Sequence, residues 1–272
     1  MSDPAAEPPV EPPAERLARV LGRFPALAVA VSGGVDSLTL ASFAHAHGLP
    51  LTVIHAVSPA VPTEATARVR AMAAAQGWEL IVTGTGEFDD ARYRDNPVDR
   101  CYFCKTNLYD RIAGLTDRPI ASGANLDDLG DYRPGLIAAA ERRVVHPFIE
   151  AQITKAEVRA LARELGLGAV AELPAQPCLA SRVETGIAID AGDLAFVELA
   201  ERRLAALTGS GTLRCRITHQ GVAVELGEGA TGREGAVDAL MTQLCAGVGR
   251  IYAGRRAYRR GAMFVGAPAM GA

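Results

Sequence analysis

The hexapeptide Ser32-Gly33-Gly34-Val35-Asp36-Ser37 lies between two apolar segments of the chain. Residues 26–31 before it predict a buried strand of a parallel sheet, and residues 38–44 after it predict a helix that packs on that strand. The two glycines allow a sharp turn, which brings several backbone N–H groups toward one point. Ser32, Ser37 and the positive end of the new helix face the same point. Such a turn is suited to bind phosphate or pyrophosphate.

The segments after this turn alternate between strand and helix patterns. Further strands are predicted at residues 51–57, 79–83, 119–122 and 143–145, and helices at residues 15–23, 63–76 and 102–115. The alternation predicts an α/β fold, in which a parallel sheet carries helices on both faces. Ligands of such sheets bind beyond the carboxyl ends of the strands, where the hexapeptide and Gly123 are both expected.

The rest of the chain predicts a second, smaller unit of α+β type. Thr154-Lys155-Ala156-Glu157 has the spacing of a capping box and predicts a helix over 155–165 that ends at Gly166. A proline-rich loop, a long helix, two strands, a helix and a last strand follow at residues 173–186, 191–207, 212–218, 222–226, 234–245 and near 250.

These patterns predict five segments. The expected boundaries are a disordered tail at 1–13, the α/β domain at 14–170, a cysteine-bearing loop or linker at 171–188, the small domain at 189–264 and a tail at 265–272.

The composition narrows the function classes. The 272 residues are 49% hydrophobic, and 28 basic against 31 acidic residues give a net charge of −3, so nucleic acid is not an expected partner. We find no signal peptide and no apolar run of membrane-spanning length. Five cysteines, an odd number, favour the reducing cytoplasm and make the thiols candidates for chemistry.

Three of the cysteines are candidates for chemistry. Cys101 and Cys104 form a CxxC pair, which is compatible with a redox couple, half a zinc site or two ligands of an iron–sulfur cluster. Zinc needs two more ligands at similar spacing, and the sequence supplies none. Cys178 is followed by Arg182, whose charge favours a thiolate. Cys215 and Cys245 lie on apolar faces and are predicted to be core residues.

Arg214 and Arg216 flank Cys215 on a predicted strand. The period of two places both arginines on the face opposite Cys215. Two guanidinium groups side by side can clamp a phosphate, although a solvated charged face fits the same pattern.

The hexapeptide resembles a known phosphate loop. No Gly-Lys-Ser/Thr follows it, so it is not a Walker A loop. It resembles the PP-loop, the SGGxDS signature of ATP pyrophosphatases, which split ATP between the α- and β-phosphates. The resemblance implies that residues 32–37 hold ATP and that Asp36 helps to hold Mg²⁺, since hard oxygen ligands suit that ion. A plain Gly–Ser turn between a strand and a helix is the alternative.

A more specific resemblance covers about residues 15 to 264. Its motifs are Asp99-Arg100-Cys101-Tyr102-Phe103-Cys104-Lys105, residues 123–135, Pro177-Cys178-Leu179-Ala180-Ser181-Arg182, residues 213–216 and residues 258–263. The chain resembles the LarE family, ATP-dependent sulfur transferases of nickel-pincer nucleotide biosynthesis. The resemblance implies adenylation of a carboxylate of pyridinium-3,5-biscarboxylic acid mononucleotide and its conversion to a thiocarboxylate, with release of AMP and pyrophosphate. It also implies homo-oligomers, often hexamers, a sulfide donor and other pincer-biosynthesis proteins as partners.

The same resemblance assigns residues to binding. His55, Val57 and Ser58 are expected at the adenine, and Gly123 and Asn125 near the nucleotide. Arg214 and Arg216 are expected to clamp the phosphate of the substrate.

The resemblance offers two sources of sulfur. In members with a single cysteine, the equivalent of Cys178 attacks the acyl-adenylate and gives up its sulfur by β-elimination. Members with three such cysteines are thought to bind a [4Fe–4S] cluster that carries an extra sulfide. Because Cys101, Cys104 and Cys178 are all present, the catalytic cluster version is favoured, with Cys178 as a sacrificial donor the alternative.

Two departures and three rival functions remain. Residues 183–186 are Val-Glu-Thr-Gly where the family usually has Ile-Pro-Tyr-Gly, and residues 262–264 replace a usual Ser-Met-Asn, which puts the substrate contacts in doubt. A PP-loop tRNA thiolase with an iron–sulfur cluster would use the basic residues at 250–260. An ammonia-using synthetase leaves the cysteines unexplained, and a non-catalytic nucleotide-binding regulator would release neither AMP nor pyrophosphate.

Overall fold

The computed structural model describes residues 11–130, 133–209, 212–227, 232–259 and 261–263. The first predicted tail ends earlier than expected, because helix α1 (Pro13–Leu21) begins at Pro13. Residues 1–10, the tail 265–272, positions 131–132 of the family motif, and Arg260 and Phe264 lie outside the described residues.

The first unit contains a parallel sheet in the order β3-β2-β1-β4. Its strands are β1 (Leu27–Ala30), β2 (Leu51–Val57), β3 (Glu79–Gly84) and β4 (Ile120–Ser122). The fifth strand predicted at 143–145 is wrong, since Val145 makes only an isolated parallel bridge to Ala121. Arg143 has a φ of 54° and Pro147 opens a helix, so the backbone is extended only briefly between them.

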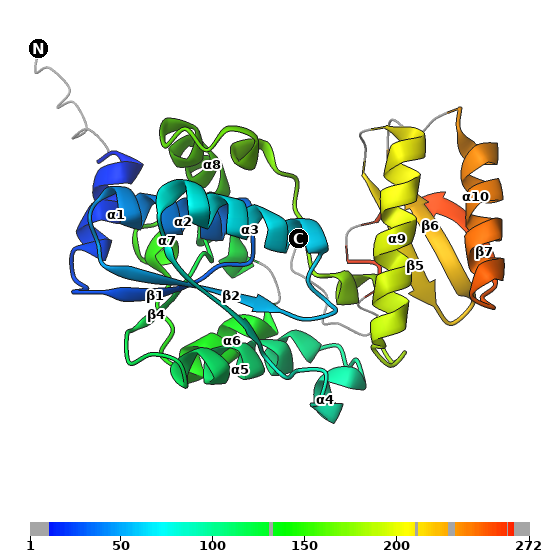
Figure 1. Cartoon of the computed structure of the whole chain (residues 1–272), viewed down its shortest axis with the longest axis horizontal. Helices are drawn as coiled ribbons and strands as arrows, with labels where there is room; N and C mark the ends of the chain where they lie inside the picture. Colours follow the sequence, from blue (N-terminus) through cyan, green and yellow to red (C-terminus); the bar gives the residue numbers. More distant parts are fainter. Residues whose placement is uncertain (1–10, 131–132, 210–211, 228–231, 260, 264–272) are drawn as a thin grey trace, which may run out of the picture.

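Helices cover both faces of this sheet, which confirms the predicted fold class (Figure 1). The helices are α1, α2 (Val35–Ala46), α3 (Thr63–Gln76), α4 (Ala91–Arg94), α5 (Arg100–Ala113), α6 (Pro134–Glu141), α7 (Pro147–Glu150) and α8 (Lys155–Glu164). Short 3-10 turns occupy Leu126–Gly130, Gly168–Glu172 and Leu179–Arg182.

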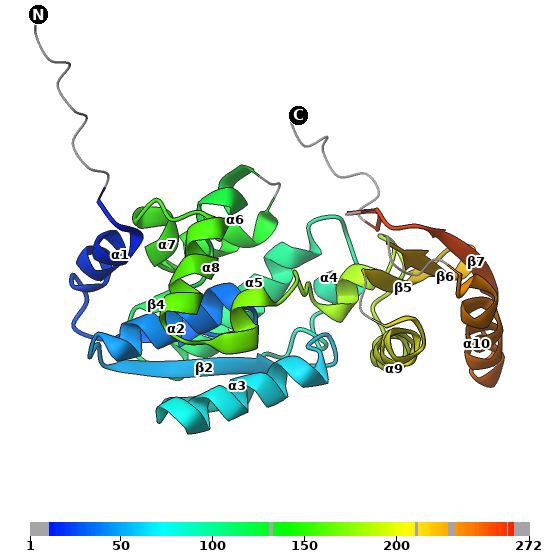
Figure 2. The same cartoon turned by 90° about the horizontal axis from the view of Figure 1, so that it is seen from above.

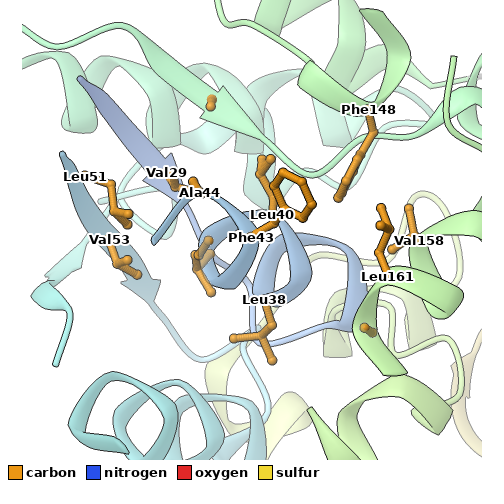
Figure 3. Packing of buried hydrophobic residues seen from close by; sticks show 14 of the residues in the cluster. Val29, Leu38, Leu40, Phe43, Ala44, Leu51, Val53, Phe148, Val158 and Leu161 are labelled. Carbon is orange, nitrogen blue, oxygen red and sulfur yellow. The ribbon is translucent and has the colours of Figure 1, made fainter. Parts of the chain in front are cut away.

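The alternation of side chains along the strands builds two apolar layers. On one face, Val29 and Val53 pack against α2, and Phe43 of α2 in turn meets Phe148 and Leu161 (Figure 3). On the other face, side chains of β1, β2 and β4 meet those of α5 and α6; the buried members are Ala28, Ile54, Tyr109, Ile112, Ile120, Ala139 and Val144. Strands buried on both faces explain their nearly continuous apolar sequence.

The second unit is a three-stranded sheet with two helices on one face (Figure 2). Strand β5 (Leu213–Thr218) pairs antiparallel with β6 (Gly221–Leu226), and β7 (Tyr252–Ala257) pairs parallel with β6. Helices α9 (Ala191–Thr208) and α10 (Glu234–Gly247) bury their apolar sides on it. Cys215 and Cys245 are 0% and 1% exposed, as predicted for core residues.

The second unit lies beyond the carboxyl end of β2 (Figure 1). Backbone hydrogen bonds join the two units: Leu179 N–H donates to Ala60 O (2.8 Å), and Ile189 N–H donates to Arg94 O (2.8 Å). The buried Asn96 side chain donates to Glu184 O and Ile187 O, both at 2.8 Å. The loop that carries Cys178 is therefore fixed at the edge of the sheet where ligands bind. Across the described part of the chain, every helix is too short or too polar to cross a membrane.

Candidate active site

The loop between β1 and α2 has the geometry of an anion site. Gly34 is the N-cap of α2 and no side chain caps it, so the first N–H groups of the helix remain available to a ligand. Ser32 and Ser37 lie together, with Ser37 Oγ accepting from Ser32 N–H at 3.1 Å and the two hydroxyls 3.3 Å apart. The predicted turn thus brings two hydroxyl groups to the uncapped start of α2.

Helix α3 contacts this loop at Gly33. Gly33 has a φ of 87°, and a Cβ built on it would lie 2.8 Å from the carbonyl oxygen of Ala65. Arg68, also on α3, donates from Nη1 to Gly33 O at 2.6 Å and to Gln176 Oε1 at 3.2 Å. One guanidinium therefore contacts both the phosphate loop and the segment that carries Cys178.

Asp36 faces a lysine that the sequence pattern did not assign to the site. Lys155 Nζ lies 2.7 Å from Asp36 Oδ1 and 2.5 Å from Oδ2, and Asn125 Nδ2 donates to Oδ1 at 3.1 Å. The capping box at Thr154 and Glu157 is confirmed and starts α8 at Lys155. The Asp36 carboxylate oxygens suit Mg²⁺. Lys155 balances the negative charge of this carboxylate.

Gly123 lies directly against the start of α2. A Cβ at this position would come within 2.7 Å of Ser37 N and 2.8 Å of Ser37 Cα. The end of β4 therefore supports the phosphate loop through a contact that only a glycine permits.

The three residues expected at the adenine differ in how deeply they are buried. His55 is 0% exposed, and its Nδ1 and Nε2 lie 2.7 Å from Val31 O and 2.9 Å from Thr66 Oγ1. Burial lowers the pKa of His55, so the neutral ring holds the end of β1 in place. Val57 and Ser58 are half-buried at the end of β2, where a ligand has access.

The first turn of α5 brings the CxxC pair toward the Cys178 loop. Cys101 and Cys104 are half-buried and Cys178 is exposed. Burial raises the pKa of the Cys101 thiol, and charge on Cys178 acts in the same direction. Burial also raises the pKa of Cys104 to about 12, with Cys178 and Cys101 adding to the effect of burial. The three thiols are thus electrostatic neighbours, although no three acidic, histidine or cysteine side chains in the described ranges form a ready metal site.

Lys105 adds a positive charge next to these thiols. Burial pushes the pKa of Lys105 down, but Tyr109 and the three thiols outweigh that effect and raise it. Thiolates at this position would therefore meet a protonated lysine.

Three arginines hold the Cys178 loop by its carbonyl groups. Arg182 Nη1 donates to Pro177 O at 2.6 Å and to Cys178 O at 3.2 Å. Arg216 Nη1 donates to Ser181 O at 3.1 Å, and Arg214 Nη2 donates to Ala175 O at 3.3 Å. The conformation of the loop is thus set by contacts to its backbone.

These three arginines differ in whether they have an acidic partner. Arg182 forms a two-bond pair with Glu201 of α9, with both distances 3.0 Å, so its charge is balanced within the fold. Arg216 is 4% exposed and pairs with the fully buried Glu225 at 2.6 Å. Arg214 has no ion pair within the described ranges, and burial followed by the charge of Arg182 lowers its pKa.

The two departures from the family pattern contact each other. Thr185 donates to Met263 O from its backbone N–H at 3.0 Å and from its hydroxyl at 2.9 Å. Segment 183–186 therefore contacts the backbone of Met263, the residue after Ala262.

Three of the basic residues near the C-terminus form ion pairs. Arg250 pairs with Asp193, Arg255 pairs with Asp238 at 2.7 Å, and Arg256 pairs with Glu225 at 3.1 Å. This arrangement weakens the case for a nucleic-acid surface there.

Several site residues had no signal in the sequence. Lys155 marked only a helix start, Lys105 ended the quoted cysteine motif without a role of its own, and Arg68, Glu201 and Glu225 belonged to no motif. The contacts of Arg68 and Lys155 join residues that lie 35, 108 and 119 positions apart, so a local pattern cannot reveal them.

The fold and the loop at its carboxyl edge define a class, the α/β proteins of PP-loop type. A comparison with protein-family models found no match. The chain is 30% identical over 210 residues to pyridinium-3,5-bisthiocarboxylic acid mononucleotide synthase of Lactiplantibacillus plantarum, covering 75% of both chains. It is also 38% identical over 215 residues to an uncharacterised protein of Synechocystis, covering 77% of this chain and 80% of that protein.

The chain therefore belongs to the LarE family of sulfur transferases, which serve nickel-pincer nucleotide synthesis. A third relative, an uncharacterised protein of Methanocaldococcus jannaschii, is 31% identical over 113 residues and covers 40% of this chain and 44% of its own.

Proposed function

We propose that this protein adenylates a carboxylate of pyridinium-3,5-biscarboxylic acid mononucleotide with ATP and then converts it to a thiocarboxylate. The name of the Lactiplantibacillus plantarum relative supports the product class. The contact that carries the proposal is made by Arg68, which bridges Gly33 O of the phosphate loop and Gln176, two residues before Cys178. An activated carboxyl and a thiol at these two places would be within reach of each other.

Each part of the site has a role in this reaction. Residues 32–37 and the N-terminus of α2 would bind the phosphates of ATP, and Asp36 would hold Mg²⁺ once Lys155 turns toward phosphate. These groups stabilise the departing pyrophosphate. A sulfur nucleophile then displaces AMP from the acyl-adenylate. Val57 and Ser58, which are half-buried at the end of β2, would meet the adenine.

The residues at the thiols fit an iron–sulfur group. Three soft ligands approach from α5 and from the Cys178 loop, and Lys105 supplies a compensating charge. The buried hydroxyls of Tyr93 and Thr106 have no hydrogen-bond partner in the described parts of the chain. A cluster held by Cys101, Cys104 and Cys178 would supply an exchangeable sulfide. Sacrifice of the Cys178 sulfur is the alternative.

Arg214 is the stronger of the two candidates for the substrate phosphate. Arg216 is already paired with Glu225, whereas the guanidinium of Arg214 contacts backbone oxygens and lies 5.9 Å from the ring centroid of Tyr258. A phosphate would supply the acidic partner that Arg214 lacks within the described ranges. We further infer a homo-oligomer in the reducing cytoplasm, from the family and from the free thiols.

The test is to purify the protein without oxygen and to measure iron, acid-labile sulfide, and AMP and pyrophosphate release. We expect about four iron atoms and four sulfides per chain, lost in Cys101→Ala, Cys104→Ala and Cys178→Ala and kept in the core control Cys245→Ala. An iron-free protein that thiolates the substrate and loses the mass of H₂S at Cys178 would establish the sacrificial route. Failure of the protein to release AMP and pyrophosphate would refute the proposed enzymatic function.

A further inference from the structure

Tyr93 is a buried tyrosine whose hydroxyl has no partner. The residue lies on α4 and is 2% exposed, and its Oη makes no hydrogen bond within the described ranges. A buried hydroxyl without a partner costs stability. The same ring without the hydroxyl would keep the edge-on contact with Phe88, which has a centroid distance of 5.6 Å. Packing therefore explains the ring and leaves the oxygen unexplained.

The surroundings of Tyr93 come from both cysteine segments. Tyr93 belongs to the same buried cluster as Leu179 and Ala180, which directly follow Cys178. Phe103 and Cys104 of α5 also pack against that cluster. Tyr93 thus shares one buried cluster with residues of both cysteine segments.

Two of the charged groups that act on the Tyr93 hydroxyl belong to these cysteine segments. Burial raises the pKa of Tyr93 far above its ordinary value, and the thiols of Cys178 and Cys104 and the carboxylate of Glu87 act in the same direction. The Glu87 carboxylate already accepts a hydrogen bond from the Thr85 hydroxyl. Arg100 acts in the opposite direction but is outweighed, so the Tyr93 hydroxyl keeps its proton and can donate a hydrogen bond.

We propose that the Tyr93 hydroxyl donates a hydrogen bond to a sulfur atom of the group that Cys101, Cys104 and Cys178 bind. This inference rests on the proposed function, because it requires a sulfur-bearing group at the three thiols. Thiolates and sulfide accept hydrogen bonds, and donors to the sulfur atoms stabilise the reduced form of an iron–sulfur group. Tyr93 is a positioning and tuning residue in this account.

The proposal predicts opposite effects in the empty and the loaded protein. In the iron-free protein, Tyr93→Phe removes a hydroxyl without a partner, so the melting temperature is unchanged or raised. In the loaded protein, the same change removes a donor to sulfur and lowers the reduction potential. A bond of ordinary strength corresponds to about a fivefold change in the ratio of reduced to oxidised protein, or about 40 mV for one electron.

Tyr252→Phe is the matched control. Its hydroxyl donates to Asp238 Oδ1 at 2.8 Å, on the far side of the second unit. The control should lower the melting temperature of the iron-free protein and leave the reduction potential of the loaded protein unchanged. Both variants and the wild type are reconstituted without oxygen from Fe²⁺ and inorganic sulfide, and both should keep the wild-type iron content.

Three outcomes separate the inference from the function on which it rests. An iron-loaded Tyr93→Phe protein with the wild-type potential overturns the inference and leaves the sulfur transferase intact. A drop in melting temperature of the iron-free variant, equal to that of the control, also overturns it, because the hydroxyl then has a partner in the empty protein. A wild type that takes up no iron overturns both the cluster route and this inference.

Discussion

Arg214 and Arg216 show how two identical residues on one strand face acquire different tasks. Glu225 stands directly across from Arg214 in the β5–β6 register, yet its carboxylate accepts from the diagonal Arg216 at 2.8 Å. Arg216 and Glu225 are both buried, so each makes the burial of the other tolerable. Arg214 remains available to a ligand.

This division predicts a difference in stability between two alanine variants. Arg216→Ala leaves the Glu225 carboxylate buried with Arg256 as its remaining partner, so we expect a loss of about 3 kcal/mol in the free energy of unfolding. Arg214→Ala breaks no ion pair within the described ranges and should cost less than about 1 kcal/mol. Urea titration of both variants measures the difference. Equal losses would show that the contacts of Arg214 with Ala175 O and Tyr258 contribute as much as the Arg216–Glu225 pair.

At the scale of elements, the turn between β1 and α2 depends on neighbouring elements. Helix α3 lies under Gly33, the end of β4 lies against Ser37 through Gly123, and α8 brings Lys155 to Asp36. Elements distant in sequence therefore fix the conformation of the turn.

The two glycines of the turn should therefore respond differently to alanine. Gly33 has a φ of 87° and no room for a Cβ, so Gly33→Ala should cost about 1–3 kcal/mol or more. Gly34 has a φ of −85°, and a Cβ there would have Ser32 Oγ at 3.6 Å as its nearest neighbour. Gly34→Ala should cost at most about 1 kcal/mol, because alanine is a poorer N-cap. Thermal unfolding without ATP checks both values, and a Gly34→Ala loss as large as that of Gly33→Ala would contradict the argument.

At the scale of the whole molecule, the distribution of charge bears on the choice between a small substrate and RNA. The net charge is −3, and the arginines of β7 face acidic partners on β6 and α10. A protein that grips RNA phosphates needs several cations free to replace counterions.

We therefore expect no specific binding of tRNA. Bulk tRNA titrated into the protein near 150 mM salt should give no affinity better than about 10⁻⁵ M, in the non-specific range. A tighter complex with a steep salt dependence would favour the tRNA thiolase. Asp238→Asn is a useful comparison in the same titration, because it removes the acidic partner of Arg255 and keeps a side chain of similar size.

Much of this architecture could be predicted from local sequence patterns. The bounds of α3 and β2 match the predictions, and the capping box at Thr154 starts α8 as expected. Those features depend on neighbours in the sequence. Helix α6 was missed, because eight residues that begin Pro-Gly and continue with apolar side chains carry little helical periodicity.

The site itself was only partly predictable. The sequence placed the hexapeptide and Cys178 in loops, but the ion pairs that Lys155 and Glu225 form depend on strand order and register. His55 illustrates the same difficulty. Its position at the end of β2 indicates a ligand contact, whereas the side-chain alternation of that strand turns the ring into the interior.

The arginine contacts to the Cys178 loop concern main-chain oxygens, so the shape of the loop does not depend on the atom at the end of the residue 178 side chain. Selenium could replace sulfur there as selenocysteine without remodelling the loop. A ⁷⁷Se nuclear magnetic resonance signal from residue 178 would then distinguish a chalcogen that stays on the protein, as a cluster ligand would, from one that leaves, as a sacrificial donor would.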